Sequence, residues 1–213
     1  MELTPEIIRQ KLSNPLPGIN SHLKLAPATR LAEIEKYLSE KNDAKKSAVL
    51  ILLFHENGKL KIIFIRRSFY VGIHAGQIAF PGGRYDENDR NVKITALREI
   101  EEEIGISREN IEILGQLTDI YVPPSNFLIS IFVGYLQKHP GYKIDEREVA
   151  EVIELNLQDF FNENIIYEKD FHVPSANQSV RALYYKIENA DIWGATAMVM
   201  TEFIDVLKTE NRE

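Results

Sequence analysis

The sequence predicts an α/β fold, with one compact domain over residues 45–213 that follows an N-terminal helical extension over residues 1–44. Three observations predict this class. Short aliphatic runs are typical of buried strands, stretches with helical spacing alternate with them, and turn-forming residues mark the junctions. The length of 213 residues also lets one domain bury a core without cross-links.

The N-terminal extension predicts two helices, over residues 4–13 and 28–40. The first begins with Thr4-Pro5-Glu6, which supplies an N-cap, a proline at the first helical position and an acid in the first turn. The second repeats apolar residues at helical spacing. Between the two helices, the run NPLPGIN is typical of a turn.

Two aliphatic runs after Ser47, AVLILLF and LKIIFI, predict buried strands. The residues between them include Asn57-Gly58, a strong signal for a tight hairpin turn, so we expect an antiparallel pair. A long loop follows from Arg66 to Asp89, and ordered loops of this length are often functional.

The rest of the chain again combines strands and helices. A helix is expected over Val92–Ile104, because Gly105 stands where a left-handed residue ends a helix. After it we predict strands at 111–121, 127–136 and 149–154, a short helix at 156–162, a strand pair at 164–172 and 180–187, and a last helix at 192–208.

Charge and composition exclude several partners. With 25 basic and 32 acidic side chains the net charge is −7, which argues against a sequence-independent nucleic-acid binder and against docking on anionic lipid. The chain has no cysteine, and its N-terminus lacks the basic and apolar regions of a signal peptide. Its longest apolar stretch is far shorter than a membrane helix. We expect a cytoplasmic protein.

The segment over residues 80–106 carries the most chemical information. On a helical wheel its apolar residues form one stripe, and three carboxylates gather on the opposite side: Glu99, Glu102 and Glu103. Because like charges at this spacing repel each other, we expect a hard divalent cation such as Mg²⁺ to neutralise them. The alternative is an ordinary solvated face, which is the more common meaning of a glutamate-rich turn.

Two neighbouring features favour the metal site. Arg98 can offset part of the negative charge and orient a glutamate through its forked guanidinium. The turn Pro81-Gly82-Gly83 lets the backbone approach the carboxylates closely, since glycine has no Cβ.

The run from Gly83 through residues 98–106 resembles the Nudix box, whose pattern is Gly, five residues, Glu, seven residues and then Arg-Glu-apolar-any-Glu-Glu-any-Gly-apolar. Its second half, REIEEEIGI, matches at every specified position. The first half departs from the pattern. Asp89 stands six residues after Gly83 where Glu is expected, and eight residues separate Asp89 from Arg98.

The loop is similar to that of one Nudix branch, the coenzyme A pyrophosphatases, which carry Gly-Gly, Asp and Asp there; this chain has Gly82-Gly83, Asp86 and Asp89. The upstream signature of that branch, an Arg-Ser pair and an FPGG turn, is matched by Arg67-Ser68 and the turn at residues 80–83. Gly72 stands where the branch usually has an arginine.

This resemblance implies an α/β/α sandwich around a mixed sheet and hydrolysis of a nucleotide diphosphate bond. It implies that Mg²⁺ or Mn²⁺ binds Glu102 and Glu103 with help from Glu99, that Arg98 orients a ligand, and that Gly83 shapes the loop. For coenzyme A (CoA) the products are 3′-phospho-AMP, also called 3′,5′-ADP, and 4′-phosphopantetheine.

Further candidates lie outside the box. Glu148 is a candidate general base or additional ligand, with Glu151 second. Arg66 and Arg67 end a strand and are candidates for binding the 3′-phosphate as a bidentate fork, and His74 is a candidate phosphate contact. For each of these residues, a structural role at the surface is the alternative.

Two other functions stay open. A different nucleotide, such as ADP-ribose, NADH or a dinucleoside polyphosphate, would use the same glutamates with another pocket. A non-catalytic binding protein of the same fold typically lacks a metal glutamate, whereas Glu99, Glu102 and Glu103 are all present. We expect a CoA-like nucleotide as partner, no nucleic acid or membrane, and allow for a homodimer.

Overall fold

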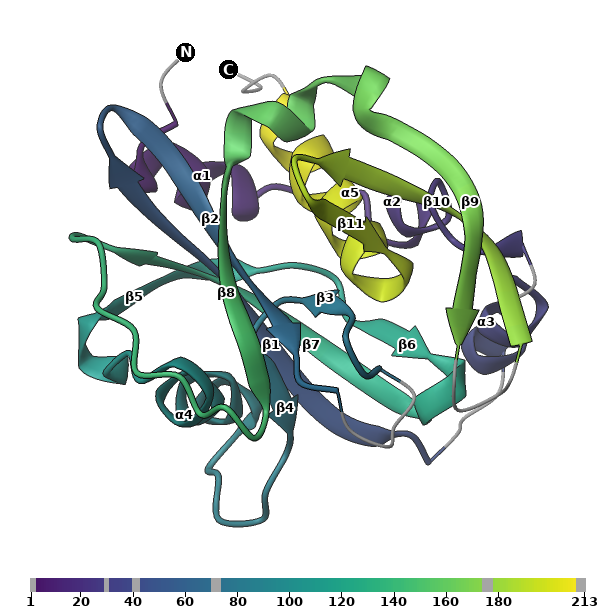
Figure 1. The fold of residues 1–213 in the computed structure, drawn as a ribbon, viewed down its shortest axis with the longest axis horizontal. Coiled ribbons are helices and arrows are strands. Elements are labelled where there is room, and N and C mark those ends of the chain that lie inside the picture. Colours follow the sequence, from purple (N-terminus) through teal and green to yellow (C-terminus); the bar gives the residue numbers. More distant parts are fainter. Residues whose placement is uncertain (1–2, 29–30, 40–42, 70–73, 174–177, 210–213) are drawn as a thin grey trace.

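A mixed β-sheet forms the centre of the molecule (Figure 1). The computed structural model describes residues 3–28, 31–39, 43–69, 74–173 and 178–209. The strand order is β3-β2-β1-β7-β5, while β4 pairs with β1, β6 with β7 and β8 with β2. The strands span Lys45–Glu56 (β1), Lys59–Arg67 (β2), Ile78–Ala79 (β3), Gly82–Arg84 (β4), Ile111–Gln116 (β5), Ile120–Val122 (β6), Phe127–Leu136 (β7) and Val149–Asn156 (β8).

Strands β1 and β7 run parallel from the pair Lys45–Phe127 to the pair Phe54–Leu136, whereas the other pairs are antiparallel. The predicted hairpin between β1 and β2 is confirmed. Its turn residues Asn57 and Gly58 both have positive φ, 50° and 74°, as a two-residue hairpin turn requires.

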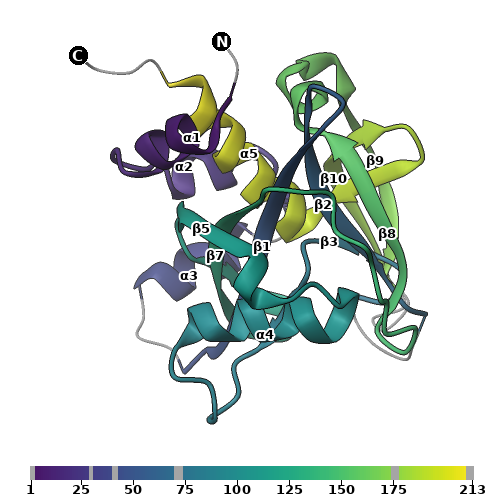
Figure 2. The same cartoon turned by 90° about the vertical axis from the view of Figure 1, so that its left-hand side faces the viewer.

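Helices cover both faces of this sheet, so the predicted α/β sandwich is confirmed (Figure 2). Because side chains alternate along a strand, β1 contributes Leu50 and Leu52 to one core and Ile51 and Leu53 to the other. Helix α4 (Val92–Ile104) closes the first core. Helix α5 (Gly194–Lys208) closes the second, on the opposite side of the sheet.

The N-terminal helices pack into the second core, with α1 spanning Pro5–Leu12, α2 Ile19–His22 and α3 Leu31–Ser39. Thr4 caps α1 as predicted, since its side chain accepts a hydrogen bond from the backbone N–H of Ile7. A buried hydrogen bond joins α2 to α5, where His22 Nε2 lies 2.8 Å from Glu202 Oε2. The boundary between extension and domain at residue 44 stays a prediction.

A second, antiparallel sheet of the strands β9 (Ile166–Val173), β10 (Gln178–Ile187) and β11 (Ala190–Trp193) packs beside α5. The first two strands match the predicted pair at 164–172 and 180–187. The last helix was predicted to begin at Ile192, which is wrong, because residues 190–193 pair with β10 and the helix begins at Gly194.

Two further predictions are corrected. The single strand expected at 111–121 is two strands, because the regular pairing of β5 with β7, which contains a bulge between Ile113 and Gly115, ends at Gln116 and resumes only at Ile120. The helix expected at 156–162 is a 3₁₀ helix over Leu157–Phe161, and a second short one follows at Glu163–Ile165. A third 3₁₀ turn, Arg108–Asn110, precedes β5, and a fourth, Pro123–Ser125, joins β6 to β7.

Within the described ranges, no helix combines the length and the apolar character that crossing a bilayer demands.

Candidate active site

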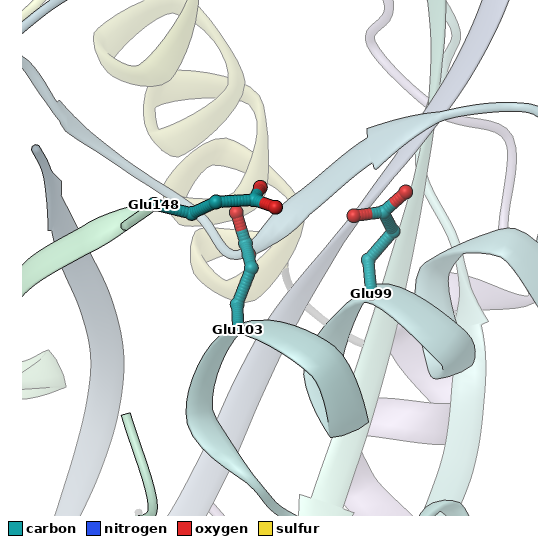
Figure 3. Close-up of side chains that lie close together, drawn as sticks. All are labelled: Glu99, Glu103 and Glu148. Carbon is teal, nitrogen blue, oxygen red and sulfur yellow. The ribbon is translucent and has the colours of Figure 1, made fainter. Parts of the chain in front are cut away.

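Three carboxylates meet beside α4 (Figure 3). Glu99 and Glu103 project from this helix, and Glu148 comes from the residue before β8. One carboxylate oxygen of each lies within 4.8 Å of the others. Three acidic groups at this distance repel each other unless a cation or protons neutralise them.

Glu103 is the most deeply buried of the three, with 1% of its surface exposed. The backbone N–H of Gly82 donates a 2.8 Å hydrogen bond to its Oε2. Its other oxygen, Oε1, is buried without a hydrogen-bond partner in the described chain, and the nearest cation is Arg67 Nη1 at 3.7 Å. Burial raises the pKa of Glu103 to about 8, although Gly82 and Arg67 oppose this shift.

Glu99 lies between Arg98 and a glycine. Its Oε1 is 2.9 Å from Arg98 Nη1, and burial nevertheless raises the pKa of this carboxyl above its ordinary value. A Cβ on Gly83 would lie 2.5 Å from either oxygen of Glu99, so only glycine leaves room for the carboxylate. The close backbone approach predicted for this turn is therefore observed.

Glu148 presents its side chain to solvent, and its backbone is held in place by the end of β2. Its carbonyl accepts a 2.9 Å hydrogen bond from the N–H of Ser68, while the Ser68 hydroxyl donates to the carbonyl of Glu146. The other acid considered for this role, Glu151, instead lies 3.0 Å from Arg66. Of the two, the structure places only Glu148 in the cluster.

An open cavity of about 540 Å³ adjoins one of the three carboxylates, Glu99. Residues 84–88, at the end of β4 and after it, line it together with Arg98 and Glu99. A small molecule can thus approach Glu99 from the loop side of α4.

These features match a known family. The family model described as the NUDIX domain matches residues 44–176, which is more than half of the chain. This protein is a Nudix hydrolase. It is 34% identical over 161 residues to an uncharacterised Nudix hydrolase NudL of Pectobacterium atrosepticum, covering 73% of this chain and 79% of that one. A NudL of Yersinia enterocolitica is 35% identical over 139 residues, covering 65% and 70%.

Solved structures agree with this fold. A MutT/nudix family protein from Enterococcus faecalis superposes with a TM-score of 0.53 at 19% identity, covering 86% of this chain and 71% of that one. The MutT protein from Methanosarcina mazei Go1 gives 0.52 at 18% identity, covering 80% and 99%. The enzyme belongs to a family of hydrolases that generally use a divalent cation.

The departure of this Nudix box from the usual pattern has a structural explanation. Asp89, which replaces the expected glutamate, is buried and accepts hydrogen bonds from Arg98 Nε and Nη2 and from the Thr95 hydroxyl. Burial alone would raise the pKa of Asp89, but these hydrogen bonds lower it below its ordinary value. The shorter side chain in the longer loop thus still reaches the box arginine.

Arg98 connects the loop to the cluster. Besides Asp89 and Glu99, its guanidinium contacts Glu102 at 2.7 Å and the carbonyl of Arg84 at 3.1 Å. These partners raise the pKa of Arg98, so it stays charged. The orienting contact predicted for Arg98 is present in the structure.

The helical wheel needs one correction. It placed the three box glutamates together on the side opposite the apolar stripe, whereas the structure buries Glu99 and Glu103 and exposes Glu102. The buried pair is spaced i, i+4 and lies beside the stripe, facing Gly82 and Gly83. Glu102 lies outside the set of three and pairs with Arg98.

The candidate substrate contacts Arg66 and Arg67 lie on opposite faces of β2. Neighbouring residues of β2 point to opposite faces, so Arg67 turns toward Glu103 and Arg66 toward Glu151. His74 is half-buried and its Nδ1 lies 3.0 Å from Gln77 Oε1. Burial lowers the pKa of His74, which keeps its imidazole neutral at pH 7. The position of Gly72 falls outside the described residues.

Proposed function

We propose that this Nudix hydrolase cleaves the pyrophosphate bond of CoA or its derivatives, giving 3′,5′-ADP and (acyl-)4′-phosphopantetheine. One observation carries the substrate assignment. In the upstream segment that resembles the CoA pyrophosphatases, Arg67 lies 3.7 Å from the Glu103 carboxylate, and the N–H of Ser68 donates to the backbone carbonyl of Glu148. A segment that neighbours one cluster carboxylate and holds the backbone of another is well placed to influence substrate choice.

We propose Mg²⁺ or Mn²⁺ as the cofactor, held by Glu99, Glu103 and Glu148. Two observations support the fit. Carboxylate oxygens are the ligands that these hard cations prefer, and the unbonded Glu103 Oε1 is a buried acceptor that lacks a partner in the described chain. A bound divalent cation supplies positive charge where negative charge develops on the diphosphate.

Residues of the chain orient the carboxylates and accept the proton of the attacking water. The Gly82 N–H holds Glu103, and Arg98 holds Glu99, so both carboxylates keep one orientation. Glu148 is the exposed member of the cluster, and we propose it as the general base that takes a proton from the attacking water. We propose Glu102, which lies on the solvent side beside Arg98, as a further ligand of the cation, as the family resemblance implies.

A substrate panel tests the assignment. CoA, acyl-CoA, ADP-ribose, NADH and dinucleoside polyphosphates are incubated with enzyme and Mg²⁺ or Mn²⁺, and the products are separated by chromatography. We expect CoA or an acyl-CoA to have the highest kcat/KM and to release 3′,5′-ADP. A kcat/KM for ADP-ribose far above that for CoA would reject the CoA assignment and leave the Nudix chemistry intact.

Variants test the site. We expect Glu103→Gln, Glu102→Gln and Glu148→Gln each to lower Mg²⁺-dependent turnover by about a hundredfold or more. Glu146→Gln is the matched control, because this exposed neighbour contributes only its backbone carbonyl to the Ser68 contact. Turnover in Glu148→Gln equal to that of the control would remove the proposed base. The homodimer and the cytoplasmic location stay predictions from the sequence.

A further inference from the structure

Phe69 is the most exposed large apolar side chain in the described part of the chain. Its surface is 83% exposed, against 50% for Tyr167 and 39% for Leu23. Exposing a phenyl ring to water is unfavourable, and a flat aromatic surface of this kind can bury itself against another flat ring.

The ring rests on a backbone surface that fits it. A Cβ at Gly76 would lie 2.6 Å from Phe69 Cε1, so the ring lies directly against this glycine, whose φ of +69° favours glycine there. The N–H of Gly76 donates to the carbonyl of Arg67 at 3.1 Å, and the N–H of Arg67 donates to the carbonyl of Gln77 at 3.0 Å. These bonds hold the glycine beneath the ring while most of the ring surface stays open.

Phe69 is connected to the carboxylate cluster by the two residues that precede it. Ser68, the preceding residue, donates its N–H to the carbonyl of Glu148. Arg67, one residue further back, lies 3.7 Å from Glu103. Phe69 is thus attached to the two residues that link β2 to the proposed catalytic groups.

We propose that Phe69 is the stacking platform for the adenine base of the substrate and thereby contributes to nucleotide affinity. A flat aromatic ring, backed by glycine and open to solvent, matches the face of a purine, and base–aromatic stacking is sequence-tolerant and strong. This inference rests on one part of the proposed function, namely that the substrate contains an adenine nucleotide. It assigns Phe69 to binding and not to the chemical step.

The test measures inhibition by each half of CoA. We expect Phe69→Ala to raise the inhibition constant of 3′,5′-ADP about tenfold, to leave that of 4′-phosphopantetheine unchanged and to change kcat less than twofold. Phe69→Tyr should retain the wild-type constant, whereas Phe69→Leu, which is apolar without a π-face, should behave like the alanine variant. Tyr167→Ala is the control for removal of an exposed aromatic ring.

Several outcomes would overturn the proposal. These are an unchanged inhibition constant for 3′,5′-ADP in Phe69→Ala, full rescue by leucine, or a loss that falls on 4′-phosphopantetheine instead. If wild-type enzyme does not hydrolyse CoA, the proposed function fails, and calorimetric titration with AMP then decides the role of Phe69 separately. AMP binding that Phe69→Ala does not weaken, or no AMP binding to the wild type, rejects the stacking platform.

Discussion

Replacing Glu103 by glutamine should stabilise the metal-free enzyme at alkaline pH while it removes activity. The wild-type carboxyl is buried, accepts a hydrogen bond from the N–H of Gly82, and has one oxygen with no hydrogen-bond partner among the described residues. In the metal-free protein its ionisation is therefore unfavourable, which is the cause of its raised pKa. Glutamine keeps the shape and the acceptor for Gly82 and carries no charge.

The size and sign of the effect follow from the pKa. A folded-state pKa of about 8 against an ordinary value of 4.5 corresponds to a loss of up to about 5 kcal/mol when the buried carboxyl is fully ionised. Below pH 4.5 the carboxyl is protonated in both the folded and the unfolded state, so the folded wild type keeps its full stability. Part of this stability is then lost as the pH rises through 4.5 to about 8. The Gln variant lacks this loss, so its advantage over the wild type grows between pH 5 and pH 8.

The assay is thermal or urea unfolding of both proteins in EDTA, from pH 5 to pH 9. We expect nearly equal stability at pH 5 and a melting temperature for Glu103→Gln that is higher by about 10 °C or more at pH 8.5, because 1 kcal/mol shifts the melting temperature of a chain of this size by about 2–4 °C. Added Mg²⁺ should raise the melting temperature of the wild type at pH 8.5 and not that of the variant. Parallel pH curves for the two proteins would refute the reasoning.

Two other substitutions test the surroundings. Gly83→Ala should lower kcat at least tenfold with little change in fold, because the new Cβ would lie 2.5 Å from the Glu99 oxygens. Steady-state kinetics measures this effect. The control is Gly141→Ala, where a Cβ would meet no atom of the described residues within 4 Å. His22→Ala should lower the free energy of unfolding in urea by about 3 kcal/mol, since it removes the partner of Oε2 on the buried Glu202, whose Oε1 keeps the N–H groups of Gly18 and Thr118. Lys24→Ala, which removes an exposed pair, should cost less than about 1 kcal/mol, and equal losses would contradict this reasoning.

The sequence predicted those helices and strands whose first and last residues depend only on neighbours in the sequence, such as capping residues. Helix α4 begins and ends where expected, because Asn91 caps its first turn and Gly105 adopts the left-handed conformation after its last. The strand expected at 111–121 failed because its break depends on the register with β7, which no local pattern contains.

The same distinction applies to the site. The glutamates of α4 were evident from spacing within one helix, but the wheel did not show which of them would be buried, since this depends on where Gly82 and Gly83 pack. Glu148 and Glu151 looked alike in the sequence. The pairing of β8 with β2 separates them, because it places Arg66 opposite Glu151.

The parallel pair β1 and β7 has a consequence for how the protein folds. The β1–β2 hairpin and helix α4 form from residues close in sequence, whereas the Lys45–Phe127 to Phe54–Leu136 ladder must bring together distant parts of the chain. Closing so long a loop costs entropy before its contacts form, so we infer that this step is slow. Glu148 precedes β8, which pairs with the distant strand β2, so Glu148 joins Glu103 only once this second long-range pairing has formed. The full set of three carboxylates therefore forms late in folding, and a cation that needs all of them binds the finished fold and does not nucleate it.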